Sequence, residues 1–337
     1  MKKIIFWLLL VVGLAALCLE GMFLFDDALS RTSPDPLDNK VVSLSAAAEA
    51  DAVDEDEAAE EAVPQKTPEE ISTDVADIVK ASMREHGIDP DQVGIVVHDF
   101  ESDAVYAHNE TKYFTAGSTY KVPLAVLFYE KIADGELALD DMLYYDASYY
   151  EEGGPVGENY QAGASIPVED LLQYVIVDSD NTAAHILIGS LGDWLSFKKE
   201  TAKYSATTIP ESDTDYFGYY NVFTAGYMND VLAYLWEHRD AFETLVDDLT
   251  AAKPDDYLNG VLGGTKMAQK YGQYEMAENA IGFSTSGHPY SIAVYTSLGY
   301  TGREWMGEVN ADIWHYFQDL DEAQQAAEEE NENDRAE

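Results

Sequence analysis

The sequence has a single cysteine and few positive charges. Cys18 lies in the apolar N-terminus, so no disulfide can form within the chain. Only 19 of the 337 residues are lysine or arginine, against 64 aspartates and glutamates, and the formal net charge is −45. Without a basic stripe the chain cannot neutralise phosphates, so we expect no nucleic-acid partner. Its hydrophobic content of 46% nevertheless allows a large core.

Several motifs of catalysis and metal binding are also missing. The sequence contains no G-x-S-x-G nucleophile motif, no H-E-x-x-H zinc motif and no glycine-rich phosphate loop. Its seven histidines are scattered without the spacing of metal ligands. We therefore expect neither a metal site nor another cofactor.

The N-terminal 30 residues contain a long apolar segment. Two lysines precede an apolar run over residues 4–19, and Glu20 interrupts it. A secretory signal usually has about 7 to 15 apolar residues, while a membrane-spanning helix needs about 20. We interpret residues 1–30 as a signal anchor or a signal peptide. The positive flank then places the rest of the chain outside the cytoplasm, anchored in the membrane by this helix or secreted after cleavage.

Two acidic segments differ in composition from the rest of the chain. Residues 31–67 are rich in alanine, proline, aspartate and glutamate and have almost no aromatics, which is typical of a disordered linker. Residues 320–337 have the same character and are predicted to form a disordered tail. The segment between them, residues 68–319, has a suitable length for one enzyme domain.

This domain has strand patterns at both ends and helical patterns in its middle. A helix is predicted over residues 68–87, where apolar residues recur at helical spacing. Two strand-like segments follow it, three more occur after residue 265, and a helix ends the domain near Asp319. Because a sheet must bring the two ends together through short connections, we predict an α+β fold. Its largely antiparallel sheet is flanked by helices and joined to a mainly helical lobe.

One apolar helical segment begins with a serine and a lysine three positions apart. In FTAGSTYKVPL, Pro123 is tolerated only near the first turn of a helix, so the helix should begin close to Ser118. Lys121 then lies one turn along on the same face. A neutral lysine can take the serine proton, and the helix N-terminus can stabilise developing negative charge. By itself the pattern is weak, because residues 196–199 repeat it and Ser118 could be a helix cap.

Two further polar segments strengthen this interpretation. Ser179-Asp180-Asn181 lies between two apolar helical runs, and Lys270-Tyr271-Gly272 lies on a strand-like segment. The first could be only a helix start, and the second could be only a strand end and a turn. Their order decides between the interpretations. A nucleophile at a helix start, a polar triplet between helices and a lysine on a returning strand occur together in one domain.

These segments resemble those of the penicillin-recognising serine enzymes, in particular the class A β-lactamase-like branch. The motifs of that branch are S-x-x-K, S-D-N and K-T-G. The first two are matched in full, and the third is changed at Tyr271. The resemblance covers about residues 70–318. It implies the β-lactamase-like fold and an extracytoplasmic active-site-serine hydrolase that opens a β-lactam or a related amide through an acyl-enzyme on Ser118.

The resemblance also implies catalytic roles. Ser118 is the nucleophile, Lys121 is its base, and Ser179 passes a proton to the leaving nitrogen. Glu211 is a candidate for the base that hydrolyses the acyl-enzyme. In this branch that glutamate belongs to an E-x-x-L-N segment, and here ESDTD keeps the acid without the Leu-Asn. An exposed loop carboxylate is the other interpretation of Glu211.

The substrate-binding residues follow from the same resemblance. Asn181 holds the amide side chain of the substrate, and Asp180 braces the loop. Lys270 provides positive charge for the substrate carboxylate beside Tyr271 and Gly272. The oxyanion hole consists of the backbone N–H groups of the nucleophile and of Gln273. Tyr271 replaces a threonine that helps to bind the carboxylate, so the selection of substrates should differ.

Two alternative functions remain open at the level of the sequence. One is a cell-wall peptide hydrolase or penicillin-binding protein with slow deacylation. The other is a non-catalytic extracytoplasmic binding or scaffold protein on the same fold, which Tyr271 and the missing Leu-Asn would suit. In either enzyme interpretation, the partner is a small-molecule or peptide amide, and we expect a monomer.

Overall fold

A computed structural model describes residues 66–205 and 218–336 of the protein. Its largest sheet is antiparallel and has five strands in the order β2-β1-β9-β8-β7. The strands are β1 (Val93–Asp99), β2 (Val105–His108), β7 (Met267–Tyr274), β8 (Ala277–Ser284) and β9 (Tyr290–Thr296). Because β1 pairs with β9, strands from the two ends of the domain lie side by side. The predicted α+β fold with an antiparallel sheet is confirmed.

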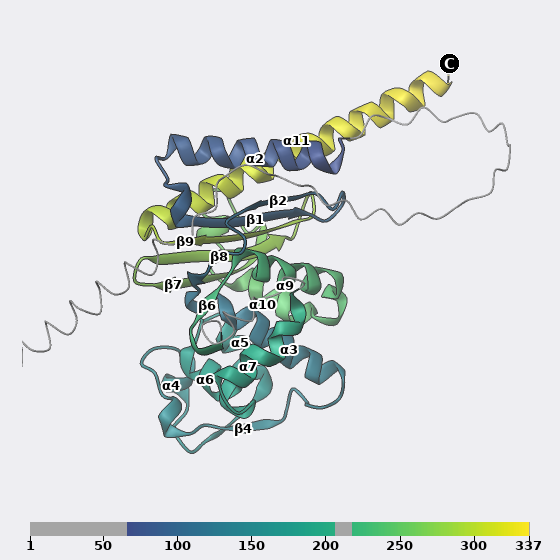
Figure 1. The fold of residues 1–337 in the computed structure, drawn as a ribbon. Coiled ribbons are helices and arrows are strands. Elements are labelled where there is room, and N and C mark those ends of the chain that lie inside the picture. Colours follow the sequence, from purple (N-terminus) through teal and green to yellow (C-terminus); the bar gives the residue numbers. More distant parts are fainter. Residues whose placement is uncertain (1–65, 206–217, 337) are drawn as a thin grey trace, which may run out of the picture. The chain divides into compact units, whose positions relative to one another are not determined.

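Helices cover both faces of this sheet (Figure 1). Successive side chains of a strand point to opposite faces, and β1 follows this rule. Ile95 and Val97 belong to one apolar core, while Val96 belongs to the other. Strands β8 and β9 are buried along their whole length, as expected for inner strands covered on both sides.

The outer face is covered by α2 (Pro68–Glu85) and α11 (Tyr300–Ala336) (Figure 1). Thr67 caps α2, and its hydroxyl accepts a hydrogen bond from the backbone N–H of Glu70 at 3.3 Å. Apolar residues of α2 at helical spacing are buried in the same core as Trp305 of α11. The indole N–H of Trp305 also donates to the Ser82 hydroxyl at 3.0 Å, which fixes the two helices against each other.

The inner face packs on a mainly helical lobe (Figure 1). Its α-helices are α3 (Lys121–Ala133), α4 (Pro155–Asn159), α5 (Val168–Ile176), α6 (Asn181–Ser190), α7 (Trp194–Thr201), α9 (Ala225–Glu237) and α10 (Glu243–Ala251). Two small sheets pair β3 (Phe114–Thr115) with β6 (Val222–Phe223), and β4 (Met142–Tyr144) with β5 (Ser165–Pro167). The 3-10 helices are η1 (Pro90–Gln92), η2 (Gly117–Tyr120), η3 (Ala147–Tyr149), η4 (Ala202–Tyr204), η6 (Arg239–Ala241) and η7 (Tyr257–Asn259).

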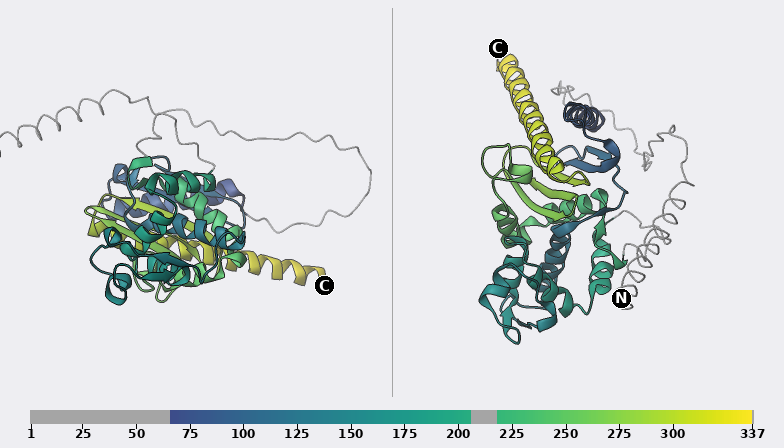
Figure 2. Two further views of the ribbon diagram at one scale, coloured as in Figure 1. Left: turned by 90° about the horizontal axis from the view of Figure 1, so that it is seen from below. Right: turned by 90° about the vertical axis from the view of Figure 1, so that its left-hand side faces the viewer.

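The C-terminal segment differs from its prediction. Residues 320–337 were expected to be disordered, but α11 continues to Ala336 and extends beyond the sheet (Figure 2). Alanine, glutamine and glutamate are good helix formers, and elongating an existing helix avoids the cost of nucleation. The packed first half of α11 therefore supports an exposed second half.

The N-terminal predictions cannot be compared with the structure. The signal segment, residues 1–30, lies outside the described residues, and so does the linker, residues 31–67, except for its last two positions. Within residues 66–205 and 218–336, no helix combines the length and the apolar character needed to span a bilayer.

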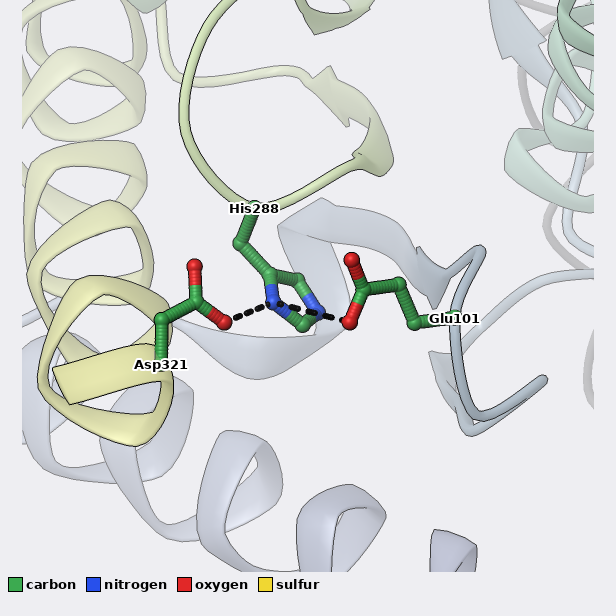
Figure 3. A group of neighbouring side chains, drawn as sticks. All are labelled: Glu101, His288 and Asp321. Atoms are coloured by element: carbon green, nitrogen blue, oxygen red, sulfur yellow. Dashed lines mark hydrogen bonds and ion pairs between the residues drawn. The ribbon is translucent and has the colours of Figure 1, made fainter. Parts of the chain in front are cut away.

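A buried histidine, drawn in Figure 3 with Asp321 of α11 and with Glu101, ties α11 to the sheet. His288, which is 2% exposed, lies between two carboxylates: Nε2 is 2.8 Å from Oδ1 of Asp99, and Nδ1 is 2.6 Å from Oδ1 of Asp321. Its ring stacks on Phe317 with centroids 4.5 Å apart. Burial lowers the pKa of His288, but hydrogen bonds to the two aspartates outweigh this effect and raise the pKa to about 9.

The stability contributed by His288 should depend on pH. The pKa is higher in the folded state than the ordinary value of 6.5, so the contribution is complete below pH 6.5 and is lost as the pH rises through 9. A shift of this size corresponds to about 3 kcal/mol. We expect His288→Gln to lower the free energy of unfolding in urea much more at pH 6 than at pH 10. An equal loss at both pH values would contradict this, and exposed His238→Gln is the control.

Candidate active site

Ser118 lies in the turn that precedes the first helix of the lobe. This turn is η2, and α3 begins directly after it at Lys121. The helix start predicted near Ser118 is therefore present, with a 3-10 turn as its first part. Gly117 has φ +57°, a left-handed conformation that favours glycine, and it allows the chain to turn from β3 into η2.

The edge strand β7 passes very close to this turn. A Cβ atom on Gly272 would lie 2.2 Å from the carbonyl oxygen of Ala116 and 2.8 Å from the backbone nitrogen of Ser118. A Cβ atom on Gly117 would lie 2.5 Å from the backbone nitrogen of Gln273. Glycine is thus required on both sides of the contact. This packing brings the turn that carries Ser118, called the serine turn below, next to the backbone amide of Gln273.

Lys121 is fully buried beneath the serine turn and has well-defined contacts. Its Nζ donates to the backbone carbonyl oxygen of Ser179 at 2.6 Å, to the Ser179 hydroxyl at 3.3 Å and to Oδ1 of Asn181 at 2.6 Å. Burial lowers the pKa of Lys121 to about 7, although the carboxylates of Asp180 and Glu151 act in the opposite direction. A substantial fraction of this amine is therefore neutral near pH 7.

The segment Ser179-Asp180-Asn181 is held rigidly at the start of α6. Ser179 has φ +57°, which is uncommon for a residue other than glycine. Asp180 is the N-cap of α6 and accepts from the backbone N–H of Ala183 at 2.9 Å. Its other oxygen accepts from the backbone N–H of Val156 at 2.7 Å. These bonds fix the loop that presents Ser179 and Asn181 to Lys121.

Lys270 and Tyr271 lie on β7 behind this loop. Lys270 is 0% exposed, and its Nζ has no hydrogen-bond partner within the described residues. Burial holds the pKa of Lys270 well below its usual range, and the positive charges of Lys121 and Lys253 act in the same direction. The Nζ of Lys270 is 4.1 Å from the ring centroid of Tyr271.

The side chain of Tyr271 contacts two neighbouring residues. Its ring stacks on Tyr257 with centroids 4.9 Å apart. Burial raises the pKa of Tyr271, and a hydrogen bond with the Ser179 side chain opposes this rise. The changed third motif is therefore connected to the second motif and to η7.

The serine turn, the start of α6 and the end of β7 border a cavity of about 340 Å³, which Lys121, Ser179 and Lys270 do not line. The residues that line it are Gly117, Ser118, Tyr120, Glu151, Asn181, His185, Trp194, Tyr219, Asn221, Gln273 and Tyr274. Ser118, Asn181 and Gln273 were predicted from the sequence to belong to the site. Glu211 lies outside the described residues.

Several lining residues were missed. Tyr219 belongs to the tyrosine-rich segment YFGYY at residues 216–220, and the sequence alone does not distinguish a tyrosine that lines a groove from one that packs in the core. Glu151 follows another tyrosine cluster, and nothing in the single sequence separates it from the other acids. In the structure its Oε1 accepts from Nδ2 of Asn181 at 2.5 Å. Its Oε2 is 3.8 Å from Nε2 of His185. Through the bond to Asn181, this carboxylate is in direct contact with the second motif.

This arrangement contains the kinds of groups that acyl transfer requires. It combines a serine hydroxyl at a helix start, a buried amine with a lowered pKa and a second hydroxyl bonded to that amine. A nucleophile, a base and a proton carrier are the groups that cleavage of an amide requires.

Comparisons with known proteins agree with this geometry. Residues 71–317 match the model of a family described as the beta-lactamase enzyme family. A protein named beta-lactamase from Rhodobacter capsulatus is 32% identical over 101 residues, which is 30% of this chain and 34% of that relative. The match thus spans about a third of the length of the curated relative.

Solved structures share the fold at low sequence identity. A mutant of PBP-A in an acyl-enzyme complex with penicillin G has a TM-score of 0.62 at 18% identity, over 72% of this chain and 97% of that one. The TLA-3 extended-spectrum beta-lactamase has a TM-score of 0.63 at 20% identity, over 72% and 99%. The beta-lactamase from Sphaerobacter thermophilus DSM 20745 has a TM-score of 0.58 at 21% identity, over 71% and 95%.

Proposed function

Since the chain belongs to the beta-lactamase enzyme family, we propose that it is a serine hydrolase that opens β-lactams or related amides through an acyl-enzyme on Ser118. The observation that carries this proposal is the environment of Lys121. A buried amine with a pKa near 7, bonded to Ser179 and Asn181 and one turn from Ser118, is suited to act as a base near neutral pH.

In the proposed mechanism, Oγ of Ser118 attacks the carbonyl carbon of the substrate. Its proton passes to the neutral amine of Lys121, and the backbone N–H groups of Ser118 and Gln273 stabilise the oxyanion. The C–N bond then breaks, and the leaving nitrogen receives a proton through the Ser179 hydroxyl. The resulting ester is the acyl-enzyme.

Hydrolysis of this ester requires a base that activates water. We propose Glu211 for this role on the basis of its place in the sequence. If Glu211 does not act there, the protein is a penicillin-binding enzyme with slow deacylation, which is the second candidate function. The absence of Leu-Asn after Glu211 favours this candidate.

We also propose that the protein acts outside the cytoplasm as a monomer. Residues 1–30 would anchor it in the membrane or would be cleaved during secretion. The support for this location is the pair of lysines before the apolar run over residues 4–19.

The function is tested by mixing the full chain with benzylpenicillin and following its intact mass over time. We expect an added mass of one penicillin, which peptide mapping assigns to Ser118, and which disappears as the penicillin is consumed. An adduct that persists would identify a penicillin-binding enzyme and would exclude Glu211 as an effective base. If no adduct forms, the β-lactam assignment fails and a binding protein becomes the better interpretation.

A further inference from the structure

The surface of the active-site cavity lacks an exposed lysine or arginine among its described lining residues. Lys121 and Lys270 are both 0% exposed, and neither lines the cavity. Apart from tyrosines, the titratable side chains that line the cavity are Glu151 and His185. Among the described lining residues, Glu151 is therefore the side chain that carries a negative charge, and its neighbour His185 is the one that can carry a positive charge.

Glu151 is held in place by contacts on both its backbone and its side chain. Its backbone N–H donates to Oγ1 of Thr182 at 3.0 Å, and the Thr182 hydroxyl in turn donates to the carbonyl oxygen of Glu151 at 3.1 Å. The side chain is 48% exposed, and its Oε1 accepts from Asn181. The other oxygen, Oε2, lies 3.8 Å from Nε2 of His185, so a donor from the substrate would bind this oxygen beside the imidazole.

A second acceptor lies close to the nucleophile. Asn221 donates from Nδ2 to the carbonyl oxygen of Gly117 at 2.9 Å, which fixes the orientation of its amide. Its Oδ1 is buried and has no hydrogen-bond partner within the described residues. Because this oxygen is buried, it does not face a substrate, and Asn221 serves to hold the serine turn at this side of the cavity.

Aromatic rings complete the environment. Tyr120 and Trp194 line the cavity and contact each other edge to face, with centroids 5.1 Å apart. Tyr120 is 7% exposed, so these rings supply mainly apolar surface at this side of the cavity. A half-exposed carboxylate, together with the lack of an exposed lysine or arginine among the described lining residues, favours a substrate group that is positively charged and carries N–H donors.

We propose that this cavity selects substrates that carry a protonated amine beside the acyl group, and that Glu151 binds that amine. This proposal rests on the proposed function, because it assumes that Ser118 is acylated by an amide. A carboxylate in the same position of the substrate would face Glu151 and would be disfavoured by like-charge repulsion.

The test compares three penicillins that share one nucleus and differ at the α-carbon of the side chain. Benzylpenicillin carries hydrogen there, ampicillin an amine and carbenicillin a carboxylate. The second-order rate constant of acylation is measured by intact mass at low salt. We expect ampicillin to react about fivefold faster than benzylpenicillin, and carbenicillin to react about fivefold more slowly, because a half-exposed charge pair is worth about 1 kcal/mol.

Glu151→Gln keeps an oxygen for Asn181 but removes the charge. In this variant the acylation rate constants of ampicillin and carbenicillin should both approach that of benzylpenicillin. Glu152→Gln is the matched control, since Glu152 is an exposed neighbour that does not line the cavity. Equal rates for the three compounds in the unmodified protein, or unchanged ratios in Glu151→Gln, would overturn the proposal.

A second measurement separates this proposal from the proposed function. Ser118→Ala cannot be acylated, so equilibrium binding of the same three penicillins can be measured by calorimetry. If no compound acylates the unmodified protein, the proposed function fails, and the binding data still decide the preference for an amine. Tighter binding of ampicillin supports the proposal, while equal or undetectable binding of all three overturns it.

Discussion

Replacement of Ser118 by alanine should abolish the covalent adduct with benzylpenicillin completely. The hydroxyl oxygen of Ser118 is the atom that forms the ester, and alanine has no atom that can replace it. Because Ser118 is partly buried in η2, the smaller side chain should leave the fold unchanged. Intact mass after prolonged incubation measures the result, and circular dichroism verifies that the variant is folded.

The second S-x-x-K segment supplies the matched control for this experiment. Ser196 on α7 has the same spacing to Lys199, but its hydroxyl donates to Oδ1 of Asp193 at 2.7 Å as part of a helix cap. Ser196→Ala should therefore retain the adduct in full. An adduct that survives in Ser118→Ala, or that is lost in Ser196→Ala, would show that the nucleophile has been misassigned.

Replacement of Lys121 by methionine should lower the acylation rate constant by about 10²- to 10⁴-fold, the range typical of a general base. Methionine keeps the length of the side chain without its amine. In the unmodified protein the rate should fall about tenfold for each pH unit below 7, because the pKa of Lys121 is about 7 and only the neutral amine accepts a proton. Stopped-flow acylation from pH 5 to pH 8 measures both effects.

Lys198 offers a comparison at a second buried lysine. Burial lowers the pKa of Lys198 to about 6, and its Nζ donates to the carbonyl oxygen of Val222 at 2.9 Å. It does not line the cavity, so Lys198→Met should keep the acylation rate and its pH profile. If Lys121→Met retained the slope below pH 7, another group would have to be the base.

The sequence was sufficient to predict the fold and the meeting of the three motifs. The periodicity of the strands after residue 265 is local, and it survives in β7, β8 and β9. Gly272 was predicted as part of the third motif, and the structure supplies the reason for glycine there, because the close approach to η2 tolerates no side chain. These features depend on residues that are near one another in the chain or that a known motif connects.

The features that were not predicted depend on tertiary contacts. The place of Glu151 at the cavity follows from its bonds to Thr182 and Asn181, which lie on another element. The ring of Tyr271 packs against Tyr257, and no local sequence pattern identifies this partner. The C-terminal segment is helical because it continues the packed earlier part of α11. This packing cannot be recognised from the composition of the segment, which by itself suggested disorder.

The order of strands in the sheet determines when the active site can form during folding. Strand β1 pairs with β9, so Val93 meets Thr296 and the sheet cannot close until the chain is complete to that point. Contacts so distant in the sequence fold slowly, because a long loop must be ordered before they form. The amide of Gln273 reaches the serine turn only when β7 has joined this sheet. Recovery of acylation after dilution from urea would therefore report complete folding, whereas the helical lobe could regain its circular dichroism earlier.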